Sequence, residues 1–260
     1  MSREIHATAI VSGKAEIGED VTIGPYTIVE DDVVIGDGCR IANSVVLANG
    51  ARLGRNVQVS TGAVIATEPQ DLKFGGEKTL AKIGDNTVVR EYVTFNRGTR
   101  AHGESSMGRD GLLMAYAHVA HDCIIGDKVI LANAVQMGGH VEIDDQAIIG
   151  GMVPIHQFTK IGAHVMVGGG FRLVQDVVPF ALVAGYPIRI SGVNAIGLKR
   201  RGFSPEAIKA IRQAFKFLFY SGLNTSQAVQ RITSEMDITP EVQLILDFIE
   251  RSNRGLVKAD

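Results

Sequence analysis

The stretch VTIGPYTIVEDDVVIGDGCRIANSVVLANGARLG, residues 21–54, places an apolar side chain at every sixth position. The periodic residues within it are Ile23, Val29, Ile35, Ile41, Leu47 and Leu53. The same grid runs in unbroken phase from Val11 to Leu173. The grid positions that are not Ile, Leu, Val, Met or Phe are Asp71, Glu77 and Ala101. A helix repeats about every 3.6 residues and a strand every two, so a strict period of six predicts a repeat architecture.

Small residues reinforce this repeat, because glycine or alanine often follows the periodic apolar residue, as at Gly18, Gly24, Gly36 and Ala42. A single repeat cannot bury its own apolar face, so successive repeats must stack on one another. The pattern resembles the hexapeptide repeat of the left-handed parallel β-helix. That resemblance implies three flat sides and about 18 residues per coil. The left-handed winding comes from the resemblance alone, because the connections between parallel strands are usually right-handed.

We therefore predict a mainly β fold, with a left-handed parallel β-helix over residues 1–190 and a small C-terminal α-helical domain over residues 191–260. Two polar, glycine-bearing segments interrupt the grid near residues 66–82 and 96–106, and are predicted to be excursions from the wall. Loops on a rigid scaffold commonly carry function, although tolerated insertions have the same appearance in sequence.

The C-terminal segment contains three helix starts. Ser204 and Thr239 each supply a capping hydroxyl directly before a proline, and Thr225 opens another amphipathic stretch. Apolar residues with helical spacing follow Ser204, and Gly222 suits the end of that helix. An irregular passage is predicted between the last repeats and these helices. The prolines that mark it are Pro179 and Pro187.

Composition and charge exclude several classes of protein. The net charge of −2 says little by itself, and no nucleic-acid partner is predicted. No apolar run approaches the ~18 residues of a membrane span and the N-terminus has no apolar signal core, which predicts no span and a cytoplasmic location. Cys39 and Cys123 are predicted to be free, buried thiols. Lys and Arg outnumber Asp and Glu after residue 189, which suits a phosphate or acidic partner, or only a solvated surface.

Histidines gather in one part of the repeat. With about 18 residues per coil and coils about 4.8 Å apart, stacking brings several of them to one strip of the prism. The residues on this strip are His121, Gly139, His140, His156 and Gln157. By the same spacing, His118 stacks against Gln136.

Histidine serves as a general base, as a metal ligand or as a group that satisfies local hydrogen bonds. Asp122 can hold the His121 ring in one tautomer, as the acid does in catalytic triads. Gly139 lets a substrate approach the backbone and can offer its N–H to an oxyanion. Spacing alone leaves catalysis and metal binding both open.

Longer motifs carry a narrower resemblance. AHVAHDCIIGDKVILAN (117–133), GGHVEIDDQAIIGGMVPIHQF (138–158) and IGAHVMVGG (161–169) resemble the acyl-[acyl-carrier-protein]–UDP-N-acetylglucosamine O-acyltransferases, which begin lipid A synthesis. QDLK (70–73) and VNAIGLKRRGFS (193–204) strengthen the resemblance. Together the motifs extend along nearly the whole chain.

The resemblance implies transfer of a (3R)-hydroxyacyl group from acyl carrier protein to the 3-hydroxyl of UDP-N-acetylglucosamine, without an acyl-enzyme. It implies that His121 is the general base, that Asp122 orients His121, and that the Gly139 N–H stabilises the oxyanion. The residues implied to bind substrate are Gln70, Asp71, Lys73, His118, His140, His156, Gln157, Asn194, Arg200 and Arg201. Those implied to form the acyl-chain pocket are Met166 and Gly169.

The resemblance further implies no cofactor and no metal, a homotrimer, and active sites between subunits. Gly169 leaves room in the implied pocket and favours a long acyl chain. Two positions depart from the family pattern: Ile196 stands where relatives often carry glutamate near the uracil, and Asn96 replaces a common histidine.

Two alternatives use the same scaffold differently. A zinc hydratase of the γ-carbonic anhydrase type would gather three histidines around a metal ion. A non-enzymatic assembly protein would need none of the histidines. The zinc-hydratase alternative leaves the helical tail, the QDLK motif and the basic Lys-Arg-Arg run that ends at Arg201 unexplained.

Overall fold

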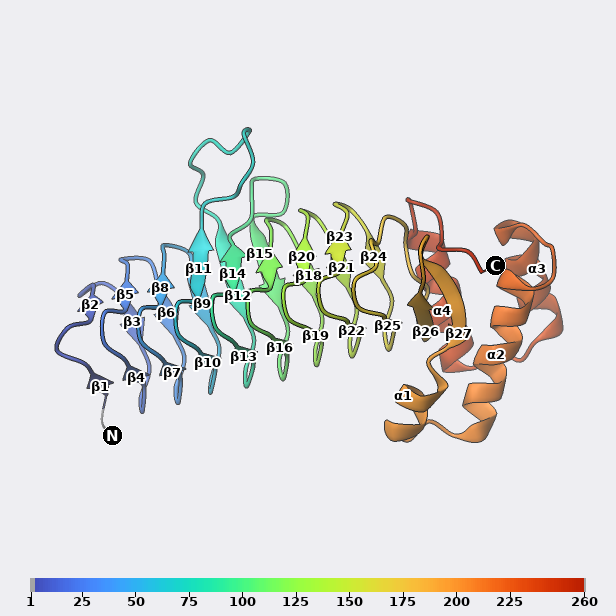
Figure 1. The fold of residues 1–260 in the computed structure, drawn as a ribbon, viewed down its shortest axis with the longest axis horizontal. Helices are drawn as coiled ribbons and strands as arrows, with labels where there is room; N and C mark the ends of the chain where they lie inside the picture. Colours follow the sequence, from blue (N-terminus) through green and yellow to red (C-terminus); the bar gives the residue numbers. More distant parts are fainter. Residues whose placement is uncertain (1–2, 260) are drawn as a thin grey trace.

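The computed structural model describes residues 3–259, which form a long prism of stacked coils capped by helices at the C-terminal end (Figure 1). The strands pair in parallel from coil to coil and make up three sheets, one for each side of the prism. This architecture confirms the predicted left-handed parallel β-helix followed by C-terminal helices.

Most strands are two residues long, and up to β25 each sheet takes every third strand of the chain. The 11-stranded sheet contains β1 (Glu4–Ile5), β4 (Thr22–Ile23), β7 (Arg40–Ile41), β10 (Gln58–Val59), β13 (Val88–Val89), β16 (Leu112–Leu113), β19 (Ile130–Leu131), β22 (Ile148–Ile149), β25 (Met166–Val167), β26 (Ala181–Ala184) and β27 (Arg189–Val193). One 8-stranded sheet contains β2 (Ile10–Val11), β5 (Ile28–Val29), β8 (Val46–Leu47), β11 (Val64–Thr67), β14 (Thr94–Asn96), β17 (His118–Val119), β20 (Gln136–Met137) and β23 (Pro154–Ile155). The other contains β3 (Glu16–Ile17), β6 (Val34–Ile35), β9 (Ala51–Leu53), β12 (Leu80–Ile83), β15 (Glu104–Met107), β18 (Ile124–Ile125), β21 (Glu142–Ile143) and β24 (Lys160–Ile161).

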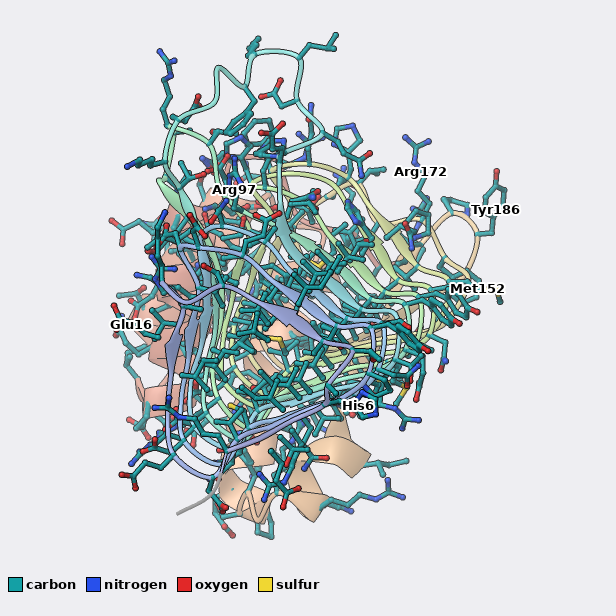
Figure 2. All side chains as sticks on the ribbon, turned by 90° about the vertical axis from the view of Figure 1, so that its left-hand side faces the viewer. His6, Glu16, Arg97, Met152, Arg172 and Tyr186 are labelled. Carbon is teal, nitrogen blue, oxygen red and sulfur yellow. The ribbon has the colours of Figure 1, made fainter. Side chains whose placement is uncertain are left out.

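The sixth-position residues point inward and stack in register. Ile41 pairs with Val59, Val59 with Val89 and Val89 with Leu113, and these side chains are buried. The Val59–Val89 and Val89–Leu113 pairs are each separated by more than the 18 residues of one coil. In both pairs the number of additional residues is a multiple of six. The grid therefore keeps its phase through both excursions. Figure 2 looks along the prism and shows apolar side chains filling its interior, whereas Glu16 and Met152 point outward.

Tight corners join the three sides. At one corner a Cβ on Gly36 would lie 2.4 Å from the Gly54 carbonyl oxygen of the next coil, so only glycine fits. Other corners use residues in the left-handed backbone region, including Asp122 (φ 58°) and His140 (φ 59°). Aspartate and histidine are among the non-glycine residues most often found there.

Two loops leave the prism from the same edge, side by side in Figure 1. The first loop, residues 68–79, joins β11 to β12, and the second loop, residues 97–103, joins β14 to β15. The strands after the loops pair with each other, with Leu80 opposite Glu104. The excursions therefore remain attached to the wall at both ends.

The chain between the last repeats and the helices is more regular than predicted. β26 continues the 11-stranded sheet and pairs antiparallel with β27 through a turn that contains a cis Tyr186–Pro187 bond. β27 crosses the predicted boundary at residue 190, because its residues complete a hairpin with β26. Sequence patterning missed this hairpin, since it abandons the six-residue repeat.

The C-terminal helices are α1 (Ala195–Arg200), α2 (Pro205–Phe219), α3 (Thr225–Glu235) and α4 (Pro240–Arg251). Ser204 and Thr239 cap α2 and α4 with their side chains, as predicted, and Asn224 caps α3 one residue before the expected start. The short α1 was not predicted, because its six residues are too few for an apolar period. Within residues 3–259, none of the helices is both long and apolar enough to cross a membrane.

Candidate active site

The histidine strip predicted from the spacing is formed around His121. The His140 N–H donates to the His121 carbonyl at 3.0 Å, and the two rings meet edge to face with centroids 5.1 Å apart. A Cβ on Gly139 would lie 2.5 Å from His121 Cε1, so glycine is required for the ring to lie where it does. The Gly139 N–H donates to no acceptor within the described part of the chain.

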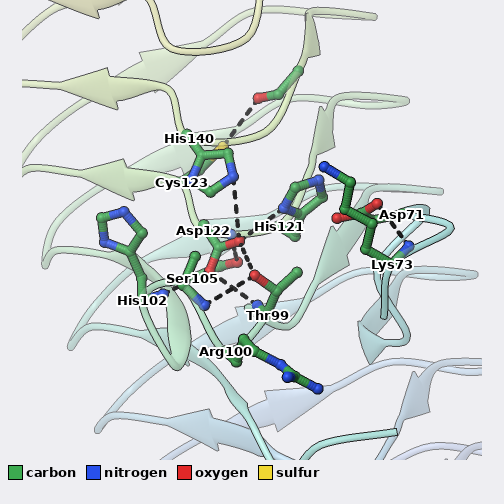
Figure 3. Close-up of polar contacts among 12 residues, drawn as sticks. Asp71, Lys73, Thr99, Arg100, His102, Ser105, His121, Asp122, Cys123 and His140 are labelled. Carbon is green, nitrogen blue, oxygen red and sulfur yellow. Dashed lines mark hydrogen bonds and ion pairs between the residues drawn. The ribbon is translucent and has the colours of Figure 1, made fainter. Parts of the chain in front are cut away.

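Asp122 holds the His121 ring. His121 Nδ1 lies 2.8 Å from Asp122 Oδ2, and Asp122 is 1% exposed (Figure 3). Burial by itself would raise the pKa of Asp122, but the hydrogen bonds from His121 and Thr99 outweigh burial and hold the pKa below its usual range. An ionised carboxylate can only accept, so Nδ1 carries the proton and Nε2 keeps the lone pair that a base needs.

The second loop supplies the other partners of Asp122. The Thr99 N–H donates to Oδ1 at 2.9 Å, the Thr99 hydroxyl donates to Oδ2 at 2.7 Å, and the His102 N–H donates to Oδ1 at 3.3 Å. The Asp122 N–H donates to Oγ of Ser105, on β15 just after the loop, at 2.8 Å. Sequence reasoning missed Thr99, His102 and Ser105. The interruption of the grid marked their segment, but no periodicity could show where that loop closes.

Two further histidines are neutral neighbours of this pair. Burial lowers the pKa of His140, whose Nε2 lies 3.7 Å from Asp122 Oδ2 and whose ring stacks on Phe158. Burial and, to a smaller extent, electrostatic repulsion between its ring and that of His121 lower the pKa of His118, which is hydrogen-bonded to Thr94 Oγ1. Both imidazoles therefore remain uncharged polar groups near neutral pH.

The predicted residues of the first loop lie on the same edge as His121. Figure 3 places Asp71 and Lys73 next to the His121 ring. The Lys73 N–H donates to Asp71 Oδ1 at 3.0 Å, which stabilises a turn within the first loop. Gln70 is exposed beside them. This part of the predicted site is therefore assembled within one chain.

His156 and Gln157 follow two coils further along the same edge, where His156 Nδ1 lies 3.0 Å from the Gln157 carbonyl oxygen. Met166 is half-buried on β25, in register with Ile148. A Cβ on Gly169 would lie 3.1 Å from the Gly151 carbonyl oxygen. The predicted acyl-pocket residues thus lie further toward the C-terminal end of the prism than His121.

The predicted nucleotide contacts lie elsewhere in the chain. Asn194 caps α1 and donates to the His164 carbonyl at 3.0 Å. Arg201 donates to the Gln146 carbonyl at 2.7 Å, and Arg200 is exposed at the end of α1. In Figure 1, α1 and the two loops lie on opposite edges of the prism. One copy of the chain therefore does not bring these residues to His121.

His121, Asp122 and His140 also have the composition of a metal site, with candidate ligand atoms within 4.8 Å of one another. A carboxylate offers about four lone-pair positions. In Asp122 these positions accept two bonds from Thr99, one from His102 and one from His121. A metal ion would have to displace one of them, so the arrangement fits an oriented base better than a metal ligand.

Comparisons with known proteins agree with this geometry. The family model "Udp N-acetylglucosamine O-acyltransferase; Domain 2" matches residues 176–257, and "Bacterial transferase hexapeptide (six repeats)" matches residues 14–49. The acyl-[acyl-carrier-protein]–UDP-N-acetylglucosamine O-acyltransferase of Thiobacillus denitrificans is 47% identical over 98% of this chain and 99% of its own length. The enzyme of the same name from Aliivibrio fischeri is 48% identical, with 98% of both chains covered.

Solved structures extend the agreement to the backbone. LpxA from Acinetobacter baumannii superposes with a TM-score of 0.95 at 41% identity, over 97% of this chain and 99% of that one. The Arabidopsis UDP-N-acetylglucosamine acyltransferase gives a TM-score of 0.83 at 30% identity, over 98% and 100% of the two chains. These matches confirm the resemblance seen in the motifs. The chain belongs to the acyl-[acyl-carrier-protein]–UDP-N-acetylglucosamine O-acyltransferase family.

Proposed function

We propose that this chain transfers a (3R)-hydroxyacyl group from acyl carrier protein to the 3-hydroxyl of UDP-N-acetylglucosamine, the first step of lipid A synthesis. Family membership supports the reaction and both substrates. The single observation that supports the mechanism is the His121–Asp122 pair, whose buried acid leaves Nε2 of the imidazole as the basic nitrogen.

In this mechanism His121 Nε2 accepts the proton of the sugar 3-hydroxyl as its oxygen attacks the thioester carbonyl carbon. Asp122 stabilises the imidazolium that forms. The Gly139 N–H, which has no acceptor within residues 3–259, donates to the oxyanion of the tetrahedral intermediate. When the intermediate collapses, the C–S bond breaks and the imidazolium returns the proton to the sulfur. No acyl-enzyme forms, because binding both substrates together supplies the proximity.

Substrate binding is divided between the edge that carries the loops and the end that carries α1. Gln70, Asp71 and Lys73 contact the sugar nucleotide from the first loop. His118, His140, His156 and Gln157 line the groove along the edge, and Met166 with Gly169 receives a long acyl chain. Asn194, Arg200 and Arg201 bind the nucleotide, and the arginine fork suits its diphosphate.

The distance between α1 and the loops supports a homotrimer. Because α1 lies on the opposite edge from the two loops in one copy (Figure 1), and the second loop contacts the His121–Asp122 pair, a neighbouring copy must supply the nucleotide contacts. The complete site would then lie between subunits. Sedimentation should give the mass of three chains, and a monomer that remains active would contradict this arrangement.

The proposed reaction needs no metal and no cofactor beyond the acyl carrier protein thioester. The four donors around Asp122 support this, since the carboxylate has no position left for an ion. The cytoplasmic location remains a prediction.

The decisive experiment is the variant His121→Ala, measured with hydroxyacyl-acyl carrier protein and UDP-N-acetylglucosamine. Turnover should fall by roughly 10²- to 10⁴-fold, the usual contribution of a general base. His6→Ala, an exposed histidine in the first coil, is the matched control and should leave turnover unchanged. Turnover retained in His121→Ala would contradict the mechanism. Stoichiometric zinc, with activity lost to a chelator, would favour the hydratase instead.

A further inference from the structure

Thr99 makes several of the hydrogen bonds that hold the second loop together. Its carbonyl accepts from the Gly103 N–H at 2.7 Å, which closes the loop, and its hydroxyl accepts from the Ala101 N–H at 3.2 Å. A hydroxyl has one proton to donate. With Ala101 on the accepting side, that proton is directed to Asp122 Oδ2, 2.7 Å away. Thr99 is buried, so water does not compete for these bonds.

The second loop is itself anchored to the first loop. The Arg97 guanidinium lies over the Phe74 ring, 5.2 Å from its centroid. The Arg100 N–H donates to Glu77 Oε1 at 3.1 Å. Residues 97–103 are therefore held between the loop that bears Asp71 and the acid that orients the base. These contacts on both sides of the second loop hold the Thr99 hydroxyl in a fixed position relative to Asp122.

We propose that Thr99 is a positioning residue for the acyl transfer: its hydroxyl holds the Asp122 carboxylate so that His121 Nε2 is directed at the sugar hydroxyl. The proposal rests on the proposed function. Thr99 does not touch the reacting atoms and acts through Asp122 alone. Hydrogen bonds to a charged acceptor are stronger than neutral ones, and the buried surroundings strengthen them further. Losing this bond leaves Asp122 Oδ2 with His121 as its remaining hydrogen-bond partner, which loosens the carboxylate and the imidazole that depends on it.

The test compares Thr99→Val, which removes the hydroxyl at nearly constant size, with Thr99→Ser, which keeps it. In Thr99→Val, kcat should fall roughly 10- to 100-fold, as small misplacements of reacting groups do, while KM for UDP-N-acetylglucosamine stays within about twofold. Thr99→Ser should restore most of kcat. Thr99→Ala also removes the hydroxyl and introduces no bulkier side chain, so it should behave like Thr99→Val. It replaces Thr99→Val in the test if Thr99→Val does not fold.

Thr27→Val is the matched control. Thr27 is also buried, and its hydroxyl donates to the Ala42 carbonyl at 2.7 Å and accepts from the Val45 N–H at 3.2 Å, in coils far from His121. It should lower the melting temperature without changing kcat. A wild-type kcat in Thr99→Val, or a Thr99→Ser variant as slow as Thr99→Val, would overturn the proposal. If these results occur while His121→Ala is inactive, the positioning role fails and the proposed function stands.

Discussion

The edge of the prism that carries His121 also carries an acid–base pair in its first coils, and the two pairs differ in their surroundings. Lys14 Nζ lies 2.6 Å from Asp31 Oδ2, with side chains 78% and 54% exposed. His121 Nδ1 lies 2.8 Å from Asp122 Oδ2, with side chains 14% and 0% exposed. Both pairs lie between the same two sheets. The second loop, residues 97–103, covers the later pair.

The comparison indicates that the second loop over His121 and Asp122, rather than the acid–base pair itself, makes this corner suitable for catalysis. Water screens Lys14 and Asp31, and exposed ion pairs of this kind contribute little to stability. Asp122 is instead held by protein donors, so it stays ionised and gives the His121 ring one orientation. A repeat protein can thus acquire a site by adding a loop above a corner that every coil already has.

The largest effect should come from Asp122→Asn. A carboxamide can donate to the ring, which would leave the proton on His121 Nε2, the wrong tautomer for a base. We expect turnover to fall about 10³- to 10⁴-fold, by analogy with triads, and no further than in His121→Ala, because Asp122 acts through that ring. The matched change in the first coils, Asp31→Asn, should leave turnover and melting temperature unchanged. Near-normal turnover in Asp122→Asn would show that the covered pair is no more important than the exposed one.

A smaller effect is expected from Gly139→Ala, whose new Cβ would lie 2.5 Å from His121 Cε1 and push the ring from its place. A displacement of this size should lower turnover about 10²-fold. The control is Gly13→Ala at the same edge, where a Cβ would meet nothing within 4 Å. Steady-state assays on both proteins sharpen the comparison, and equal turnover would mean that the His121 ring needs no fixed position.

Much of this molecule follows from its sequence, because the interior of a prism is periodic. The apolar grid predicted the stacked coils, and its spacing placed Gly139 and His140 beside His121. The side chains of Ser204 and Thr239 identified two helix starts, since capping is a local interaction.

The missed features depend on contacts between segments distant in sequence. Thr99 meets Asp122 because the second loop folds back over 23 residues of chain, and nothing in the loop's own composition reveals the direction it takes. The β26–β27 hairpin and α1 lack any repeat. Family resemblance supplied Asn194 and Arg200, which lie at the two ends of α1, on the opposite edge from the two loops.

The most direct test of the central claim, that Asp122 acts through His121, is a double-mutant cycle on turnover. Residues that act as one unit show losses that do not add. Asp122→Asn should slow the wild-type enzyme strongly but leave the His121→Ala enzyme no slower than it already is. If the two losses multiplied in the double variant, Asp122 would contribute independently of His121, and its role as the acid that orients the base would be contradicted.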